Sequence, residues 1–117
     1  MRHIESNMQQ AFIHWFRLLY PKDWRMCFAV ANGGARNPKE GAMLKREGVV
    51  AGVADVMITI PRGGYGSLGL EFKTSTGRQS AAQKDWQADF ERVGNKYVVV
   101  RSLDEAIEVT KNYLKET

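Results

Sequence analysis

Two short segments carry charged residues whose types and spacing could act on a phosphate group. The first is Asp55 followed by an apolar run, and the second ends in Glu71-Phe72-Lys73. Because strand side chains alternate between the two faces of a sheet, the charged residues fall on one face and the regularly spaced apolar residues on the other. The Gly-rich stretch 61–67 between the segments predicts a hairpin loop.

The apolar alternation predicts how the two strands pair. The expected antiparallel pairs are Ile60–Leu68, Ile58–Leu70 and Val56–Phe72. This register places Asp55 across from Lys73 and diagonal to Glu71. Neighbouring strands lie about 4.8 Å apart and alternate side chains about 6.6 Å apart, so the three charged groups would surround one small site.

Two carboxylates and a lysine on an otherwise apolar hairpin suit a hard divalent cation beside a phosphate oxygen. The carboxylates of Asp55 and Glu71 can hold a magnesium-like ion that keeps several waters. Lys73 can then neutralise charge on the phosphate or position a nucleophilic water. The alternative is a solvated strand face with an ordinary Asp–Lys pair, and spacing alone leaves both interpretations open.

Two further polar residues have both a structural and a functional interpretation. Glu5 stands beside the apolar stripe of the first predicted helix, where it either points back into the site or is a favourable anion in the first turn. Gln83 is either the third residue of a capping box that begins at Ser80 or a contact to substrate or an active-site water. The predicted helix after Ser80 begins close to Lys73, so its first amides could face a phosphate.

The remaining pattern predicts an α/β domain with one mixed sheet flanked by helices, in the order α-β-α-β-β-α-β-α. We expect a single domain over residues 1–117. Helical spacing and capping signals predict helices over 4–20, from Asn37 to Gly48, from Ser80 to Gly94, and after Ser102. Strands are predicted over 24–30 and 97–100, in addition to the two of the hairpin.

Composition is that of an ordinary globular protein, with 44% hydrophobic and 26% charged residues. The single cysteine, Cys27, excludes an internal disulfide and is expected to be a buried hydrophobe. No signal peptide or long apolar stretch is present, so a cytoplasmic location and no membrane association are expected. The net charge of +4 favours polyanionic partners.

Basic residues gather around the second predicted helix, where phosphate contacts or a solvated helix face explain them equally well. As DNA contacts we predict Arg36, Lys39, Lys45, Arg46 and Arg78.

With these residues in place, the chain resembles the PD-(D/E)XK nuclease superfamily and, within it, the VRR-NUC (virus-type replication-repair nuclease) family. The matching residues are Glu5; Lys45-Arg46-Glu47-Gly48 leading to Gly52-Val53-Ala54-Asp55; Glu71-Phe72-Lys73; Ser80 through Gln83 with Trp86; and Val99-Val100-Arg101-Ser102. They cover nearly the whole chain. One departure is Ala54, which stands where the family pattern has proline before the aspartate. Without a further domain, the chain is similar to the stand-alone viral and bacterial members.

The resemblance implies a restriction-endonuclease-like fold and a metal-dependent phosphodiesterase that acts on DNA, in a bacterial or virus-infected cytoplasm. It implies that Asp55, Glu71 and the backbone carbonyl of Phe72 bind Mg²⁺ or Mn²⁺, and that Glu5 completes or orients the metal shell. Lys73 would assist the attacking water or stabilise the transition state, and Gln83 would lie near the scissile phosphate.

The resemblance also implies selectivity for branched DNA, such as the four-way (Holliday) junctions and flaps of DNA repair. Similar stand-alone nucleases work as homodimers, and two-fold symmetry suits a junction with two opposed strands. Trp24 could anchor a partner surface or pack under the first helix.

Two other classes stay open at this point. A non-catalytic nucleic-acid-binding module would keep the fold and lose the chemistry, and the intact Asp55, Glu71 and Lys73 set argues against it. A structural or assembly protein would carry the same charges as a surface pair. A true metal site should gain thermal stability with millimolar manganese, because a ligand that binds only the native state stabilises it.

Overall fold

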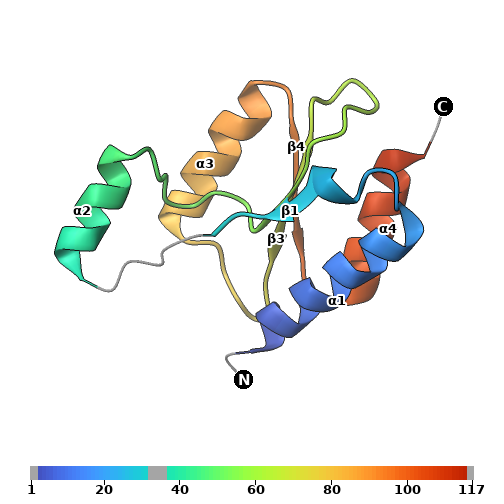
Figure 1. The fold of residues 1–117 in the computed structure, drawn as a ribbon, viewed down its shortest axis with the longest axis horizontal. Helices are drawn as coiled ribbons and strands as arrows, with labels where there is room; N and C mark the ends of the chain where they lie inside the picture. Colours follow the sequence, from blue (N-terminus) through green and yellow to red (C-terminus); the bar gives the residue numbers. More distant parts are fainter. Residues whose placement is uncertain (1–2, 32–36, 116–117) are drawn as a thin grey trace.

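Four strands form one mixed sheet with helices on both of its faces (Figure 1). The strands are β1 (Cys27–Ala29), β2 (Val56–Ile58), β3 (Leu68–Phe72) and β4 (Lys96–Val100), and they are ordered β1-β2-β3-β4 across the sheet. The first two pairings are antiparallel and the pairing of β3 with β4 is parallel. The structure is a computed structural model and describes residues 3–31 and 37–115.

The helices follow the predicted order. They are α1 (Ile4–Leu19), α2 (Pro38–Arg46), α3 (Ala81–Arg92) and α4 (Leu103–Leu114). Three of them begin at the predicted caps, where the side chains of Asn37, Ser80 and Ser102 accept backbone N–H groups of the first turn. None of the helices in the described part of the chain has the length and apolar character needed to span a bilayer.

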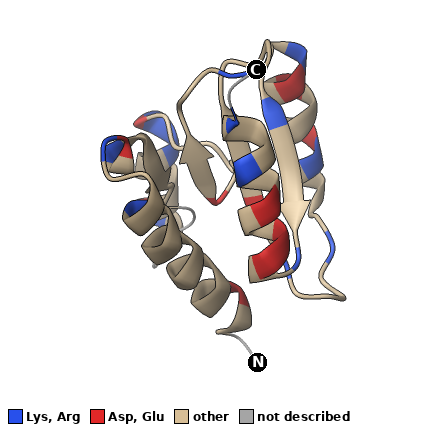
Figure 2. Ribbon diagram, turned by 90° about the vertical axis from the view of Figure 1, so that its right-hand side faces the viewer, with Lys and Arg blue, Asp and Glu red and all other residues tan. Residues whose placement is uncertain are grey.

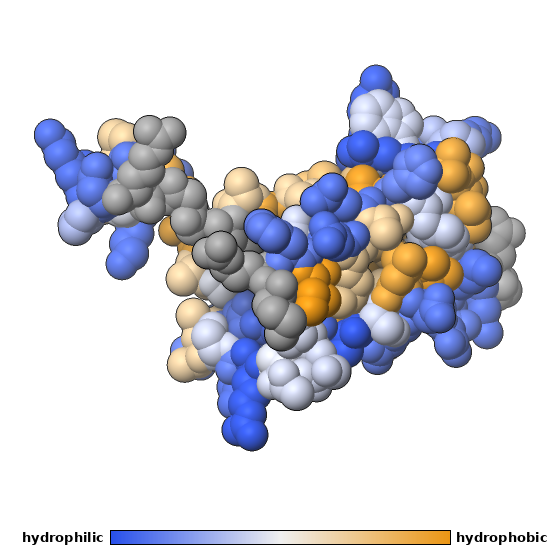
Figure 3. Space-filling view, turned by 90° about the horizontal axis from the view of Figure 1, so that it is seen from below, coloured by the Kyte–Doolittle hydropathy of each residue, from blue (hydrophilic) through white to orange (hydrophobic). Residues whose placement is uncertain are grey.

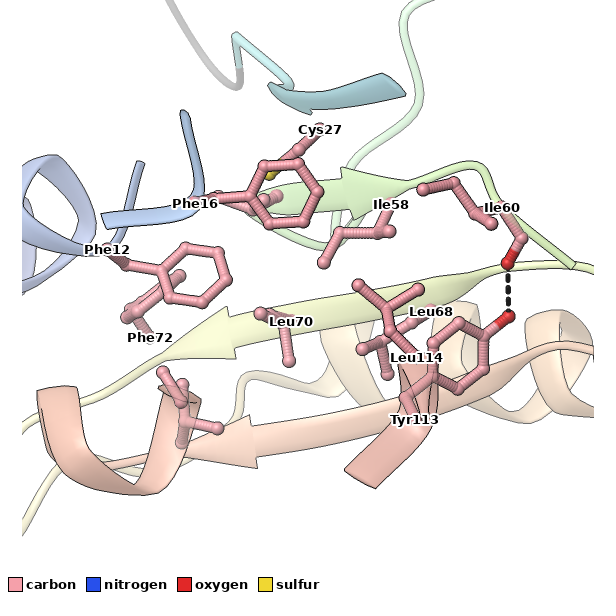
Figure 4. Packing of buried hydrophobic residues seen from close by; sticks show 13 residues of the cluster. Phe12, Phe16, Cys27, Ile58, Ile60, Leu68, Leu70, Phe72, Tyr113 and Leu114 are labelled. Atoms are coloured by element: carbon pink, nitrogen blue, oxygen red, sulfur yellow. Dashed lines mark hydrogen bonds between the residues drawn. The ribbon is translucent and has the colours of Figure 1, made fainter. Parts of the chain in front are cut away.

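The main core lies between the sheet and the pair α1 and α4 (Figure 4). Phe12 and Phe16 of α1 pack with the buried face of β3, and Leu114 of α4 closes the same cluster. Burial of each such side chain contributes roughly 1.5–3 kcal/mol. Cys27 is buried in this cluster as predicted, and burial raises the pKa of its thiol to about 12.

A smaller cluster lies on the other face of the sheet, under α3. Trp86 and Phe90 stack there with ring centroids 4.3 Å apart, and Tyr97 of β4 packs edge-on against Phe90. A Cβ atom on Gly69 would meet the Phe90 ring at 3.0 Å, so glycine lets α3 approach the sheet closely. The polar residues of the hairpin share this face, and α3 therefore covers one side of the candidate site.

The predicted hairpin register is wrong by two residues. Val56 pairs with Leu70 and Ile58 with Leu68, so Ile60 lies beyond the ladder. A shift by two residues leaves every side chain on its own face, and the apolar alternation therefore cannot distinguish the two registers. The turn is tight: Gly63 and Gly64 both have positive φ, and Arg62 and Tyr65 exchange backbone hydrogen bonds around them.

The predicted strand over 24–30 is correct only in its second half. Residues Trp24–Met26 form a 3-10 turn, η1, because the N–H of Met26 donates to the carbonyl of Asp23 before β1 begins. Trp24 is 39% exposed, and the guanidinium groups of Arg17 and Arg25 lie 5.3 and 4.8 Å from its ring centroid. It therefore lies at the surface rather than under α1.

Helix α2 projects from the body of the molecule as an arm (Figure 3). None of its residues is buried, and hydrophilic side chains cover much of its surface. Lys39, Lys45 and Arg46 are all exposed on this arm. The predicted contact Arg36 lies outside the described residues.

Candidate active site

The carboxylates of Asp55 and Glu71 meet where β2 and β3 pair. Continuing the observed ladder by one residue places Asp55 opposite Glu71, whereas the predicted register had placed it opposite Lys73. The Asp55 side chain is fixed there because its Oδ2 accepts the backbone N–H of Phe72 at 2.7 Å. The two acidic groups therefore face one another directly across the strands.

Glu71 is the most deeply buried charged side chain of the site, with 2% of its surface exposed. Its Oε2 accepts from Nε2 of Gln83 at 2.6 Å, and its Oε1 accepts from the hydroxyl of Tyr97 at 2.9 Å. One donor comes from α3 and the other from β4. These two bonds hold the carboxylate in one orientation, and each oxygen keeps a lone pair for a further ligand.

The ionised form of this acidic pair is disfavoured. Burial and the nearby Asp55 charge raise the pKa of Glu71 to about 7, although the bonds to Tyr97 and the Lys73 charge act in the opposite direction. Burial also raises the pKa of Asp55, and the charge of Glu5 adds to that effect. A buried carboxylate beside a half-buried one favours a proton or a cation between the two.

Lys73 and Glu5 flank the carboxylate pair. The Nζ of Lys73 lies 3.9 Å from Oε2 of Glu71, and its side chain is 14% exposed. Oε2 of Glu5 accepts the backbone N–H of Thr74 at 3.3 Å, immediately beyond Lys73. Helix α1 thus brings a third carboxylate to the end of β3, close enough for its charge to act on Asp55.

The structure shows one of the two roles predicted for Gln83, the cap, together with a bond to Glu71 that was not predicted. The Oε1 of Gln83 accepts the backbone N–H of Ser80 at 2.8 Å and completes the capping box of α3. Its Nε2 donates to Glu71 at the same time. The cap therefore fixes the side chain that orients the buried carboxylate.

Gly52 explains how the segment before Asp55 reaches this position. Its φ is +85°, and a Cβ atom there would collide with the backbone carbonyl oxygen of Ala82 in the first turn of α3. Glycine is required both for the positive φ and for the close approach. The chain can then pass over the start of α3 and enter β2 at Asp55.

Three residues that support the site were not predicted from the sequence. Tyr97 binds Glu71, and Nε2 of Gln79 donates to the Tyr97 oxygen at 3.2 Å. Arg101 donates to the carbonyls of Thr74 and Gly77 at 2.8 and 2.7 Å and so holds the loop that follows β3. A tyrosine within an otherwise aliphatic strand was the available signal, because a buried hydroxyl needs a partner.

The donor set fits a hard divalent cation. Asp55 and Glu71 supply oxygen ligands, and magnesium often uses only one or two carboxylates while it retains waters. Within residues 3–31 and 37–115, no three His, Cys, Asp or Glu side chains form a ready-made metal cluster. Glu5 accordingly adds charge nearby without joining the pair as a third clustered ligand. The backbone N–H of Phe72 donates a hydrogen bond to Asp55, so the Phe72 peptide group lies next to this carboxylate.

The structure separates the predicted DNA contacts into two groups. Arg78 is exposed in the loop between β3 and α3. Lys39, Lys45 and Arg46 lie on the projecting arm, and nothing in their position brings them to the carboxylates (Figure 1).

Comparisons with known proteins bear on the fold and the family of the chain. No protein-family model and no curated protein matches the chain. A solved structure described as a "VRR_NUC domain protein" matches with a TM-score of 0.82 and 27% sequence identity, over 94% of this chain and 87% of that one. This match supports membership of the VRR-NUC family. The nuclease-type fold predicted from the sequence, a mixed sheet flanked by helices, is thereby confirmed.

Proposed function

We propose that this VRR-NUC domain is a Mg²⁺- or Mn²⁺-dependent DNA endonuclease that hydrolyses phosphodiester bonds in branched DNA, such as four-way junctions or flaps. The observation that carries the proposal is the facing pair of carboxylates, half-buried Asp55 and buried Glu71, with Lys73 beside them. An acidic pair that resists ionisation destabilises the apoprotein. A bound cation would offset the cost of ionising the two carboxylates, which supports a cation-dependent activity.

In this proposal, Asp55 and Glu71 hold the metal ion, with the Phe72 carbonyl as a further ligand and Glu5 orienting the shell. When bound, the ion polarises the phosphate and lowers the pKa of a water molecule. Lys73 neutralises charge on the scissile phosphate as a water oxygen bonds to phosphorus and a P–O bond breaks. Gln83 and Tyr97 are positioning residues, because they act on Glu71.

A panel of labelled junction, flap, fork and duplex DNAs tests the proposal. The purified protein is incubated with each DNA in the presence of magnesium, manganese or EDTA, and the products are resolved on denaturing gels. We expect cleavage that requires the metal and favours branched DNA. DNA binding without cleavage under any condition would instead identify a non-catalytic nucleic-acid-binding module.

Lys73→Ala is expected to remove cleavage while preserving metal binding. Its ammonium group lies 3.9 Å from the Glu71 carboxylate. It supplies positive charge but has no lone pair with which to bind the metal ion. Loss of one preorganised positive group at a transition state typically costs about 10²–10³ in rate. Calorimetric titration with manganese measures binding separately from the cleavage assay. A variant that neither cleaves nor binds manganese would show that Lys73 shapes the metal site itself.

Charge reversal on the arm is expected to weaken DNA binding equally for all sequences. Lys45→Glu removes an exposed cation from α2, and each lost phosphate contact reduces the slope of log K against log salt by about one. Binding is measured by fluorescence anisotropy in EDTA at several salt concentrations. Arg78→Glu, in the loop between β3 and α3, provides the comparison. An unchanged slope for Lys45→Glu would make α2 a solvated helix face.

We further propose that the domain works as a homodimer, in which a two-fold axis presents two active sites to opposed strands. Exposed apolar side chains lie in η1 and in the edge strand β1 that follows it, and they support a contact there: Trp24, Met26 and Phe28, at 39%, 42% and 41% exposure. Sedimentation velocity at micromolar concentration should give twice the 13.2 kDa chain mass. A single monomeric species with and without junction DNA would exclude the dimer.

A further inference from the structure

A cavity of about 420 Å³ lies away from the carboxylate pair. It is formed by the turn at Arg62, the start of β4 and the last turns of α4. Its volume is within the range of small-molecule binding sites. The proposed cleavage chemistry involves none of the residues that line this cavity.

The charge of the cavity is positive. Arg62 and Lys96 line it, and no carboxylate is among its described lining residues. One guanidinium nitrogen of Arg62 donates to the adjacent Pro61 carbonyl at 2.8 Å, which orients the group. The Arg62 charge opposes the burial that raises the pKa of the Tyr113 hydroxyl, so the cation acts within the cavity. Asp104 and Glu105 lie in the first turn of α4, at the other end of the helix from Asn112 and Tyr113, and Figure 2 shows acidic residues toward that end. Glu108, which precedes the lining residue Val109, is exposed and is not among the lining residues.

Aromatic and apolar side chains form the rest of the wall. Tyr65 is 40% exposed, and its ring centroid lies 6.4 Å from that of Tyr113. The Nζ of Lys96 lies 5.3 Å from the centroid of the Tyr65 ring. The Tyr113 hydroxyl donates to the Ile60 carbonyl at 2.7 Å, which fixes that ring (Figure 4). Val98 and Val109 complete the apolar surface.

We propose that this cavity binds one nucleotide of a single-stranded DNA segment. Arg62 and Lys96 would pair with its phosphate, and Tyr65 would stack with the base. Aromatic rings combined with a positive groove are the general means by which proteins hold single strands without reading sequence. The amide of Asn112, which also lines the cavity, can hydrogen-bond a base edge. The inference rests on the proposed function only in taking DNA as the ligand.

The two sites are separate on the sheet. Lys96 and Val98 point to the face covered by α4, whereas Glu71 bonds to Tyr97 on the face covered by α3. Lys96 pairs with Leu68 at the start of β3, while Glu71 lies near the end of that strand. A strand in this cavity therefore leaves the carboxylate pair free, and an unpaired arm of a branched substrate could be held there during cleavage.

Titration of the full chain with a short oligothymidylate, in EDTA and followed by ¹⁵N–¹H NMR, locates the binding site directly. We expect the amide signals of Tyr65, Lys96 and Asn112 to shift together with one dissociation constant. Shifts confined to residues around the carboxylates, such as Thr74 and Gln83, would overturn the inference. Failure of the oligonucleotide to bind at all would overturn it equally.

Matched variants separate stacking from general electrostatic attraction. Tyr65→Phe keeps the ring and should bind oligothymidylate as the unmodified protein does, whereas Tyr65→Leu should bind roughly tenfold or more weakly. Equal affinities for the Phe and Leu variants would exclude stacking on this residue. The outcomes remain distinct from the cleavage test: binding at the cavity by a protein that cleaves no DNA would refute the proposed nuclease and leave this inference standing.

Discussion

Asp55→Ala and Glu71→Ala are each expected to abolish metal-dependent DNA cleavage, with rates reduced by at least about 10²–10³-fold. The two carboxylates face one another across β2 and β3, and they are the hard oxygen donors that converge at this point. Removal of either takes away one of the two carboxylates that hold the ion, so the ion binds more weakly and in a less defined position. Gel-based cleavage of junction DNA at saturating manganese measures the effect.

The fold should survive both substitutions. Neither side chain belongs to the main apolar core, and removal of Asp55 also takes away a charge that raises the pKa of Glu71. Circular dichroism and thermal unfolding in EDTA provide the check. Glu108→Ala, an exposed carboxylate on α4, is the matched control and should cleave normally. Full activity of Asp55→Ala or Glu71→Ala would refute the assignment of the site.

Much of this site could be predicted because its residues lie on regular elements. Strand alternation alone placed Asp55, Glu71 and Lys73 on one face, and the capping pattern placed Gln83 in the first turn of α3. These predictions depend on local backbone geometry, which short sequence patterns indicate directly.

The parts that could not be predicted depend on how distant elements pack. The hairpin register differs by two residues, and a pattern with a period of two gives no information on such a shift. The bond from Tyr97 to Glu71 exists because β4 pairs in parallel with β3, with Gly69 opposite Tyr97. The capping signals predicted that α2 forms but gave no information on its position, and the structure shows that none of its residues is buried.

The free energy of unfolding of the metal-free protein is expected to fall as pH rises through 7. The Glu71 carboxyl has a pKa of about 7 in the folded protein and an ordinary value of 4.5. The folded state therefore binds more protons than the unfolded state between these values, and stability decreases as pH rises. One pKa unit corresponds to about 1.4 kcal/mol, so the loss is at most about 3 kcal/mol. The raised pKa of Asp55 acts in the same direction.

Urea denaturation in EDTA between pH 5 and 8 measures this loss, and two variants assign it to Glu71. Glu71→Gln keeps the side-chain volume without the titrating group, and its stability should depend less on pH. Tyr97→Phe removes a hydrogen bond that lowers the pKa of Glu71, so its stability should continue to fall at higher pH than that of the unmodified protein.

Manganese should reverse the pH dependence, since a metal ion binds the ionised carboxylates and competes with their protons. The gain in unfolding free energy with millimolar manganese is therefore expected to be small at pH 5 and to grow through pH 7, and the rate of DNA cleavage should rise over the same interval. A gain of the same size in Glu71→Gln would place the ion elsewhere on the protein. In EDTA, the unfolding free energies of the unmodified protein and of Glu71→Gln could instead depend on pH in the same way. That result would show that Glu71 is already ionised in the folded protein. The carboxylate pair would then hold no proton to exchange for a cation.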